Sequence, residues 1–225
     1  MKRAASLLAL IALSTAALAA PVPTGNLLVN GSFESTAVAN GGWVNVATTP
    51  GWTWLAGPGT GFEIRNNIAG RAQDGLNYIE LDTNGNSTIG QYLDNLSAGA
   101  RYDLSFWYSP REFQAASTNG IQAFWNGVQL GATLSGLGGN GNEWTEVKFS
   151  LTAQGGRNLL SFASVGSSDS LGGNLDNVRL NSVPEPSSLA LTFAALAGCL
   201  LLPRLLRRKA EARRAIALAA TLKRG

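Results

Sequence analysis

Short apolar segments, each closed by glycine, asparagine, aspartate or serine, recur along the chain from Asn26 to Asn181. The segment Leu76–Leu81 alternates apolar and polar residues, as a strand with one buried face does. About ten such segments recur at intervals of roughly 8–12 residues, and no convincing helical pattern lies among them. Parallel α/β folds need crossover helices between their strands, so this spacing predicts an antiparallel β-sandwich or a β-barrel.

Two local patterns add detail to this expectation. Asn126-Gly127 separates two strand-like segments, and this pair is the strongest short signal for a β-hairpin. The segment Asn26–Asn30 also predicts a strand, which ends at the turn residues Gly31 and Ser32.

The start of the chain differs from the rest in composition. Met1–Arg3 is positive, Ala4–Leu18 is apolar, and small residues precede Pro21. This is the pattern of a secretory signal peptide that is cleaved after Ala20. We therefore expect residues 1–20 to be a signal peptide and residues 21–182 to be an exported β domain.

The excess of positive charge in the chain lies at its two ends. Residues 21–182 hold seven basic and twelve acidic side chains, a net charge of −5, although the whole chain carries +3. The basic isoelectric point therefore gives no reason to expect nucleic-acid binding. The chain has no histidine, and its only cysteine is Cys199. The exported domain consequently has no disulfide, and catalytic arrangements that depend on histidine are excluded.

Three zones follow one another at the C-terminal end. They are the motif Val183-Pro184-Glu185-Pro186, the apolar run Leu189–Leu202 and the basic cluster Arg204–Lys209. The apolar run is short for a membrane span, which needs about 20 residues, and the basic side chains favour a cytoplasmic position for the following end. Residues 183–209 thus predict a transmembrane sorting segment, and residues 210–225 predict a basic cytoplasmic tail.

This order of motif, apolar run and basic cluster resembles the PEP-CTERM sorting signal of Gram-negative bacteria that make exopolysaccharide. The resemblance implies a transient hold in the inner membrane, recognition by an exosortase-type membrane protease, and transfer to the cell surface or outside the cell. Residues 210–225 depart from the pattern, because such signals usually end near their basic cluster. The alternative is an ordinary membrane anchor.

Several pieces of the exported domain resemble, in order, the galactose-binding-like jelly rolls, including a cell-wall β-sandwich family of unknown function. The pieces are Asn26–Glu34, Pro50-Gly51-Trp52, Tyr78–Asp82, Gly99–Phe106 and Leu175–Val178. The resemblance implies an all-β jelly-roll sandwich. It also implies carbohydrate binding, which is common among such folds.

In related carbohydrate-binding jelly rolls, a carboxylate after the first strand and an aspartate on the last strand meet at a structural calcium ion. Glu34 and Asp176 stand at the matching positions. Calcium takes about 6–8 oxygen ligands, so backbone carbonyls and water would supply the others. The alternative is that both carboxylates cap turns or accept backbone hydrogen bonds.

Aromatic side chains are a second kind of candidate, because the apolar face of a sugar ring stacks on an aromatic ring. Strand alternation puts Trp52 and Trp54 on one face. In the same way, Trp107 points away from Phe106 and Tyr108. Core packing is the competing role for each tryptophan. The carbohydrate-binding candidates are Trp54, Trp107 and Arg111.

A catalytic role is the third kind of candidate. A glycosidase needs two carboxyl groups about 5–10 Å apart in a cleft. The acidic residues to consider are Glu63, Glu80, Asp82 and Glu112. Nothing in the sequence brings two of them together, and neither histidine nor a reactive cysteine is available, so we expect no enzyme.

The sequence therefore predicts an exported, non-catalytic protein that binds carbohydrate or belongs to an extracellular matrix of exopolysaccharide or biofilm. A structural surface protein that makes protein–protein contacts without binding sugar is the alternative. A glycoside-acting enzyme is the third reading.

Overall fold

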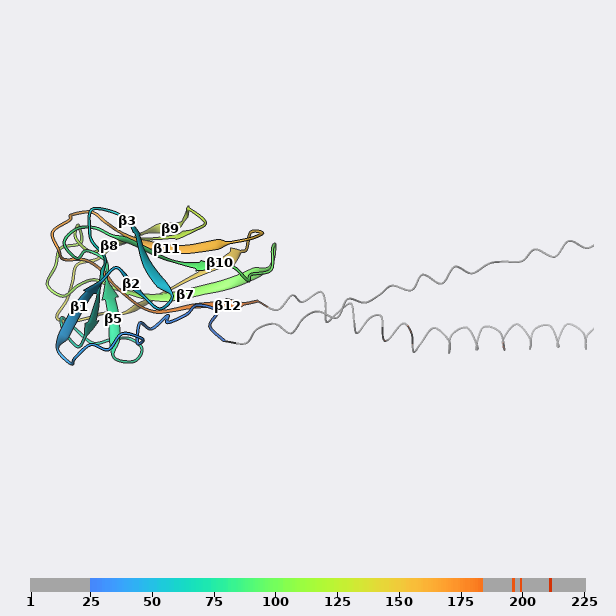
Figure 1. Cartoon of the computed structure of the whole chain (residues 1–225), viewed down its shortest axis with the longest axis horizontal. Coiled ribbons are helices and arrows are strands. Elements are labelled where there is room, and N and C mark those ends of the chain that lie inside the picture. The colour runs from blue at the N-terminus through green and yellow to red at the C-terminus, as the bar shows by residue number, and fades with distance from the viewer. Residues whose placement is uncertain (1–24, 184–195, 197–198, 200–210, 212–225) are drawn as a thin grey trace, which may run out of the picture. The chain divides into compact units, whose positions relative to one another are not determined.

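Within the part of the chain that the structure describes, twelve β-strands form two antiparallel sheets of six strands each, and the sheets pack against each other as a sandwich (Figure 1). The computed structural model describes residues 25–183 and, beyond them, positions 196, 199 and 211. Sheet A contains, in spatial order, β1 (Gly42–Val46), β4 (Phe62–Asn66), β5 (Asn77–Glu80), β12 (Asn174–Ser182), β7 (Arg101–Ser109) and β10 (Thr145–Thr152). Sheet B contains β2 (Thr48–Thr49), β3 (Trp52–Ala56), β6 (Thr88–Leu93), β11 (Asn158–Val165), β8 (Gly120–Trp125) and β9 (Val128–Leu134). The predicted all-β sandwich is confirmed.

The segment Asn26–Asn30 is an exception to the predicted strands, because it forms bends and turns. Asn30 has a φ of 55°, which lies outside the extended region. The Asn26 side chain takes the place of ladder bonds: its Nδ2 donates to Val178 O (2.8 Å) and its Oδ1 accepts from Leu180 N (2.9 Å). Two backbone hydrogen bonds, from Leu27 N to Leu180 O (2.9 Å) and from Val178 N to Gly31 O (2.8 Å), complete the attachment of this segment to β12.

The predicted hairpin at Asn126-Gly127 is confirmed. Strands β8 and β9 pair on either side of it, with Trp125 opposite Val128. The φ values are 50° at Asn126 and 79° at Gly127. Positive values at both central residues indicate a type I′ turn, whose twist matches that of the flanking strands.

Five aromatic rings form a continuous chain through the core. The distances between ring centroids are 5.5 Å for Phe33–Trp52, 6.0 Å for Trp52–Phe162, 4.9 Å for Phe162–Phe106 and 6.3 Å for Phe106–Phe149. Trp52 and Phe162 belong to sheet B, whereas Phe106 and Phe149 belong to sheet A. The chain of rings therefore joins the two sheets across the middle of the sandwich.

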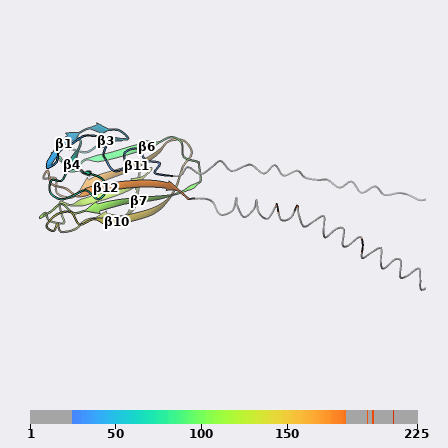
Figure 2. The same cartoon turned by 90° about the horizontal axis from the view of Figure 1, so that it is seen from below.

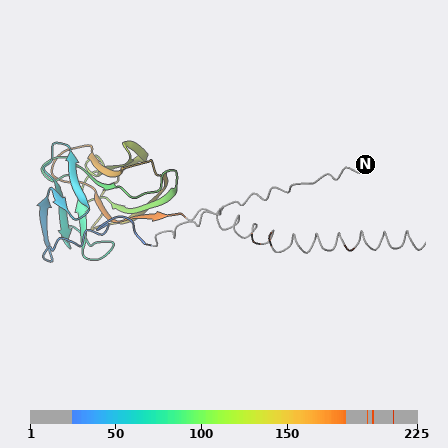
Figure 3. The ribbon, with the colours of Figure 1, turned by 45° about the vertical axis from the view of Figure 1, so that its right-hand side comes forward.

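Polar side chains line the face of sheet A that points away from sheet B, which we call the outer face. Figure 2 shows β12, β7 and β10 side by side, and Figure 3 shows the blue and teal strands at the other end of the sheet. Paired residues of antiparallel strands point to the same side. One row across β1, β4, β5, β12 and β7 consists of Asn45, Glu63, Glu80, Asn174 and Ser109. Their neighbours Ile64, Ile79 and Leu175 point into the core.

The predicted terminal segments fall largely outside the described residues. This applies to the signal peptide at 1–20, to the sorting segment at 183–209 beyond Val183, and to the tail at 210–225. Strand β12 ends at Ser182, directly before the motif at 183–186. Within the described part of the chain, no helix has the length and apolar character needed to cross a membrane.

Candidate functional site

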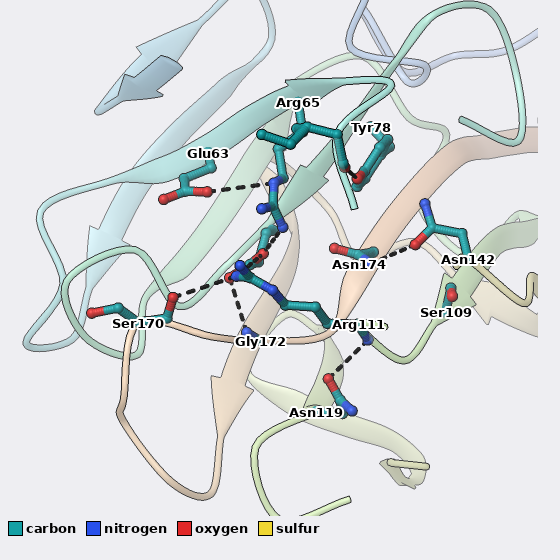
Figure 4. Close-up of polar contacts among 12 residues, drawn as sticks. Glu63, Arg65, Tyr78, Ser109, Arg111, Asn119, Asn142, Ser170, Gly172 and Asn174 are labelled. Atoms are coloured by element: carbon teal, nitrogen blue, oxygen red, sulfur yellow. Dashed lines mark hydrogen bonds and ion pairs between the residues drawn. The ribbon is translucent and has the colours of Figure 1, made fainter. Parts of the chain in front are cut away.

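Glu80, on β5, is the centre of a buried ion cluster on the outer face. Figure 4 labels its neighbours Arg65, Arg111 and Gly172. Its oxygens accept hydrogen bonds from Arg65 Nη1, from Arg111 Nη1 at 2.8 Å and from Gly172 N at 2.9 Å. The Glu80 side chain has no exposed surface. Glu63 lies on the other side of Arg65, with its Oε2 3.6 Å from Arg65 Nε. One carboxylate thus joins β4, β5 and the loops that carry Arg111 and Gly172.

Burial changes the protonation of this cluster. It raises the pKa of Glu80 from 4.5 to about 7, although the guanidinium groups of Arg65 and Arg111 act in the opposite direction. Burial also raises the pKa values of Glu63 and Asp82. At Glu80 and Glu63, the loss of hydration therefore raises the pKa more than the attraction of Arg65 and Arg111 lowers it.

Three buried polar atoms next to the cluster have no hydrogen-bond partner among the described residues. They are Arg65 Nε, Asp82 Oδ1 and Asn174 Oδ1. Arg65 Nε approaches Glu63 only at the ion-pair distance given above. Since buried polar atoms nearly always have partners, this part of the face retains unused hydrogen-bonding capacity.

The geometry gives the four acidic residues considered for catalysis separate surroundings. Glu63 and Glu80 are cross-strand partners, so their side chains are neighbours. Glu80, however, is fully enclosed and both its oxygens are held by guanidinium groups. Asp82 Oδ2 accepts a hydrogen bond from Asp169 N at 3.0 Å. Glu112 lies half-buried in the loop after β7. The cluster therefore holds loops in place, and its central carboxylate cannot reach a glycosidic bond.

An open groove of about 490 Å³ lies on the outer face over β7, β10 and β12. Its lining residues are Asp103, Leu104, Ser105, Glu146, Lys148, Phe149, Ser150 and Asn181. Trp107 belongs to the same outward row of β7 as Asp103 and Ser105, and it pairs with Glu146 on β10. An aromatic side chain therefore stands in line with a polar groove.

The polar groups of the groove are partly paired with one another. Lys148 Nζ lies 2.8 Å from Glu146 Oε2, and Ser150 Oγ donates to Asp103 Oδ1 at 2.9 Å. Hydroxyl, carboxylate, ammonium and amide groups are thus all present at the surface of one sheet. Such a surface can bind a ligand that carries many hydroxyl groups and has an apolar ring face for the aromatic side chain.

The three residues predicted to bind carbohydrate do not share one surface. Trp107 is half-buried on the outer face of sheet A. Arg111 lies in the following loop, where its Nη1 is bound to Glu80. Trp54 lies on β3 of sheet B, paired with Ile89 and 37% exposed. A ligand on the outer face of sheet A cannot contact Trp54, because the sandwich core lies between them.

Glu34 and Asp176, the residues predicted to bind calcium, both hold the loop that precedes β5. Glu34 Oε1 accepts from the backbone N–H groups of Leu76 (2.8 Å) and Asn77 (2.6 Å). Asp176 Oδ2 accepts from those of Gln73 (2.7 Å) and Asp74 (2.9 Å). Both carboxylates thus accept backbone hydrogen bonds from one loop, which is the alternative role considered for them, and the calcium site stays a prediction.

The chemistry of this pair fits a hard cation. Carboxylate oxygens are ligands that calcium prefers. Burial raises the pKa of Asp176 to about 7, and the groups that lower it are backbone N–H donors, with no cation among them. Within residues 25–183, however, no group of three or more acidic or cysteine side chains is placed to hold a metal ion. Glu34 and Asp176 would therefore need backbone carbonyls and water as further ligands.

Asp103, Glu146 and Lys148 are groove residues that the sequence analysis did not single out. Their signal is nevertheless present in the alternation of polar and apolar residues along β7 and β10. That alternation predicts one polar face for each strand. It cannot predict that the two faces adjoin, because strand order within a sheet depends on the whole topology.

Comparison with family models finds no match. Two curated proteins are similar to the chain, both named multifunctional-autoprocessing repeats-in-toxin. The protein of Vibrio cholerae serotype O1 is 32% identical over 170 residues, which are 76% of this chain and 3% of the toxin. The protein of Vibrio vulnificus is 30% identical over 169 residues, which are 74% of this chain and 3% of the toxin. The chain thus spans about 3% of the length of these relatives.

Solved structures of carbohydrate-binding modules also resemble the chain. TmCBM61, in complex with β-1,4-galactotriose, is 14% identical, with a TM-score of 0.47 over 70% of this chain and 99% of that one. Family 16 carbohydrate-binding module 2 is 17% identical, with a TM-score of 0.44 over 69% and 99%. CBM35 from Paenibacillus barcinonensis is 17% identical, with a TM-score of 0.41 over 64% and 100%. TM-scores of this size support no conclusion about function. The chain is an all-β sandwich that is similar in outline to carbohydrate-binding modules.

Proposed function

We propose that the domain is a jelly roll that binds a polysaccharide non-catalytically, in the groove over β7, β10 and β12. The observation that carries this proposal is the polar groove of about 490 Å³ with Trp107 in line with it. A sugar chain would place one ring against Trp107 and offer its hydroxyl groups to Asp103, Glu146 and Asn181. The names of the similar carbohydrate-binding modules agree with this proposal but do not carry it.

Trp107→Ala is expected to weaken binding to a neutral polysaccharide by about tenfold or more, because aromatic anchors dominate such contacts. The measurement is the retardation of the purified protein in native gels that contain galactan, β-glucan or xylan. Trp54→Ala is the matched control, since Trp54 lies in sheet B and should leave retardation unchanged. If no polysaccharide retards the protein, or if both variants lose retardation equally, the proposed groove is wrong.

A structural surface protein without sugar binding is the second reading, and it would show no retardation in any of these gels. A glycoside-acting enzyme is the third. It would release reducing sugar from one of the polysaccharides, and that release would depend on two of the acidic residues Glu63, Glu80, Asp82 and Glu112. Burial of Glu80 argues against this third reading.

We further propose that the domain is exported and acts outside a Gram-negative cell, in an exopolysaccharide or biofilm matrix. The signal-peptide pattern at 1–20 and the ordered zones at 183–209 support this proposal. An exosortase-type protease would cut near the motif at 183–186 after a transient stay in the inner membrane. Mass spectrometry of the exported protein should then give a chain that ends near residue 185. Recovery of a chain that still carries residues 187–225 outside the cell would contradict the proposal.

A structural calcium ion at Glu34 and Asp176 is also part of the proposal. Addition of calcium at about 100 times its Kd should stabilise the domain by about 2.7 kcal/mol, which corresponds to roughly 5–10 °C in Tm. Thermal unfolding with calcium and with a chelator measures this difference. Asp176→Asn should abolish it, whereas Asp94→Asn, in an exposed ion pair with Arg157, should preserve it. Equal Tm values with calcium and with chelator would contradict the calcium site. Glu34 and Asp176 would then act only as acceptors of backbone hydrogen bonds.

A further inference from the structure

The loop between β4 and β5, residues 67–76, is held by side chains from several distant parts of the chain. Glu34 and Asp176 hold its second half through the backbone N–H groups described above. Its first half is held through carbonyl groups. Ile68 O accepts from Tyr78 Oη, and Arg71 O accepts from Trp144 Nε1 (2.9 Å) and Asn142 Nδ2 (3.0 Å). The loop is therefore fixed along its length, although it lies at the surface.

Backbone strain at one residue, Ala69, accompanies this fixation. Asn67 and Ala69 have φ values of 51° and 55°, and Gly70 has 124°. The left-handed conformation is unfavourable for alanine, because its Cβ approaches the following carbonyl oxygen. Strained residues persist only where the surrounding contacts determine their conformation, and such places cluster at binding sites. The contacts that hold Ile68 and Arg71 lie directly beside these residues.

The fixed loop forms one wall of a pocket of about 300 Å³. The lining residues are Asn40, Asn66, Asn67, Arg71, Ala72, Gly75 and Leu76. Asn67 Nδ2 donates to Asn40 Oδ1 at 2.9 Å, which leaves the Asn40 amide nitrogen available as a donor. The volume is at the lower end of the range for small-ligand pockets.

Arg71 supplies the charge of this pocket. Its side chain is exposed, and among the described residues its guanidinium group makes no hydrogen bond and no ion pair, whereas its carbonyl is held. The acidic groups of the same loop region have other partners. Asp74 lies 3.4 Å from Arg179 Nη2, and Glu34 accepts the two backbone hydrogen bonds described above. A guanidinium group without a carboxylate partner has its planar set of N–H donors free for an oxyanion.

We propose that this pocket binds an oxyanion, the carboxylate or sulfate group of an acidic glycan, through Arg71 and the amide of Asn40. The proposal rests on the proposed function, because it assigns the charge class of the polysaccharide. The net charge of −5 over residues 21–182 opposes general attraction of acidic polymers. Preference for an acidic glycan would consequently have to come from this one local site.

The test compares polygalacturonate, dextran sulfate and a neutral galactan in affinity gels with the purified protein. Wild-type protein should bind at least one acidic polymer about tenfold more tightly than galactan, and the better of the two identifies carboxylate or sulfate as the ligand. Arg71→Gln should remove this preference and leave galactan binding unchanged. Arg157→Gln, which makes the same change of net charge at an exposed side chain of the surface around sheet B, should retain the preference.

The outcomes separate this proposal from the proposed function. Binding of galactan without preference for an acidic polymer would overturn the oxyanion pocket and leave the groove intact. Equal losses in Arg71→Gln and Arg157→Gln would also overturn it, because the preference would then follow net charge alone. If no polymer binds, both proposals fail. An unchanged melting temperature in Arg71→Gln would confirm that any loss reflects the ligand contact.

Discussion

Glu80→Ala is expected to destabilise the domain by about 3–5 kcal/mol, because removal of one member of a buried ion cluster leaves the others without compensation. Arg65, Arg111 and the backbone N–H of Gly172 would all lose the acceptor that Glu80 gives them in a place with little access to water. Only Glu63 at 3.6 Å from Arg65 Nε and Ser170 O at 3.4 Å from Arg111 Nη1 would remain near the two guanidinium groups among the described residues. Urea unfolding followed by tryptophan fluorescence measures the loss. Glu80→Gln retains one acceptor oxygen and should show a smaller loss.

The control for this prediction is Glu146→Ala. Glu146 pairs with Lys148, whose side chain is 69% exposed, and exposed pairs contribute about 0–1 kcal/mol. Similar losses for Glu80→Ala and Glu146→Ala would mean that the buried cluster does not hold the loops.

The same cluster gives the domain a pH dependence. The folded-state pKa of Glu80 is raised from 4.5 to about 7, so between these pH values the folded state binds more protons than the unfolded state. The free energy of unfolding should consequently fall as the pH rises from 5 to 8. Glu80→Ala should remove part of this slope. The remainder belongs to Asp176, whose pKa is also raised to about 7, and to Glu63 and Asp82, whose pKa values are raised as well.

Phe162→Ala should destabilise the domain by about 3–5 kcal/mol, equivalent to roughly 10 °C in Tm, because it creates a cavity in the middle of the core. Phe162 is fully buried and contacts both Trp52 and Phe106, so its loss interrupts the chain of aromatic rings between the sheets. Thermal unfolding by circular dichroism measures the change.

Phe113→Ala is the matched control for Phe162→Ala. Phe113 is 69% exposed, and the same change of side chain there should alter the free energy of unfolding by at most about 0.5 kcal/mol. Phe162→Leu, which keeps most of the volume, should lie between the two and remains measurable if the alanine variant does not fold. An unchanged Tm in Phe162→Ala would contradict the role of the ring chain.

Much of the fold follows from local patterns in the sequence. The alternation in β7 correctly puts Trp107 on the face opposite Phe106 and Tyr108, and the structure shows that the latter two lie in the core. The pair Asn126-Gly127 correctly predicts its hairpin, because its conformational preference is local. The segment Asn26–Asn30 misleads, since its apolar residues suit a strand while the chain turns there and the Asn26 side chain makes two of the hydrogen bonds to β12.

The candidate site depends on contacts that no local pattern contains. Arg65 and Arg111 converge on Glu80 from positions 15 and 31 residues away in the chain. Trp54 and Trp107 look equivalent in the sequence, yet they lie in different sheets. The groove exists because β7 lies between β10 and β12, and this order is a property of the complete topology.

The position of β12 has a consequence for how the domain folds. Strand β12 is the last strand of the described residues, but it lies in the interior of sheet A, between β5 and β7. Asp176, which it carries, bonds to residues 102 and 103 positions earlier. Contacts of such long sequence separation form slowly. During synthesis from the N-terminus, sheet A therefore stays divided until residues 174–182 have been made. Until then the loop at 67–76 also lacks Asp176, one of its two carboxylate partners.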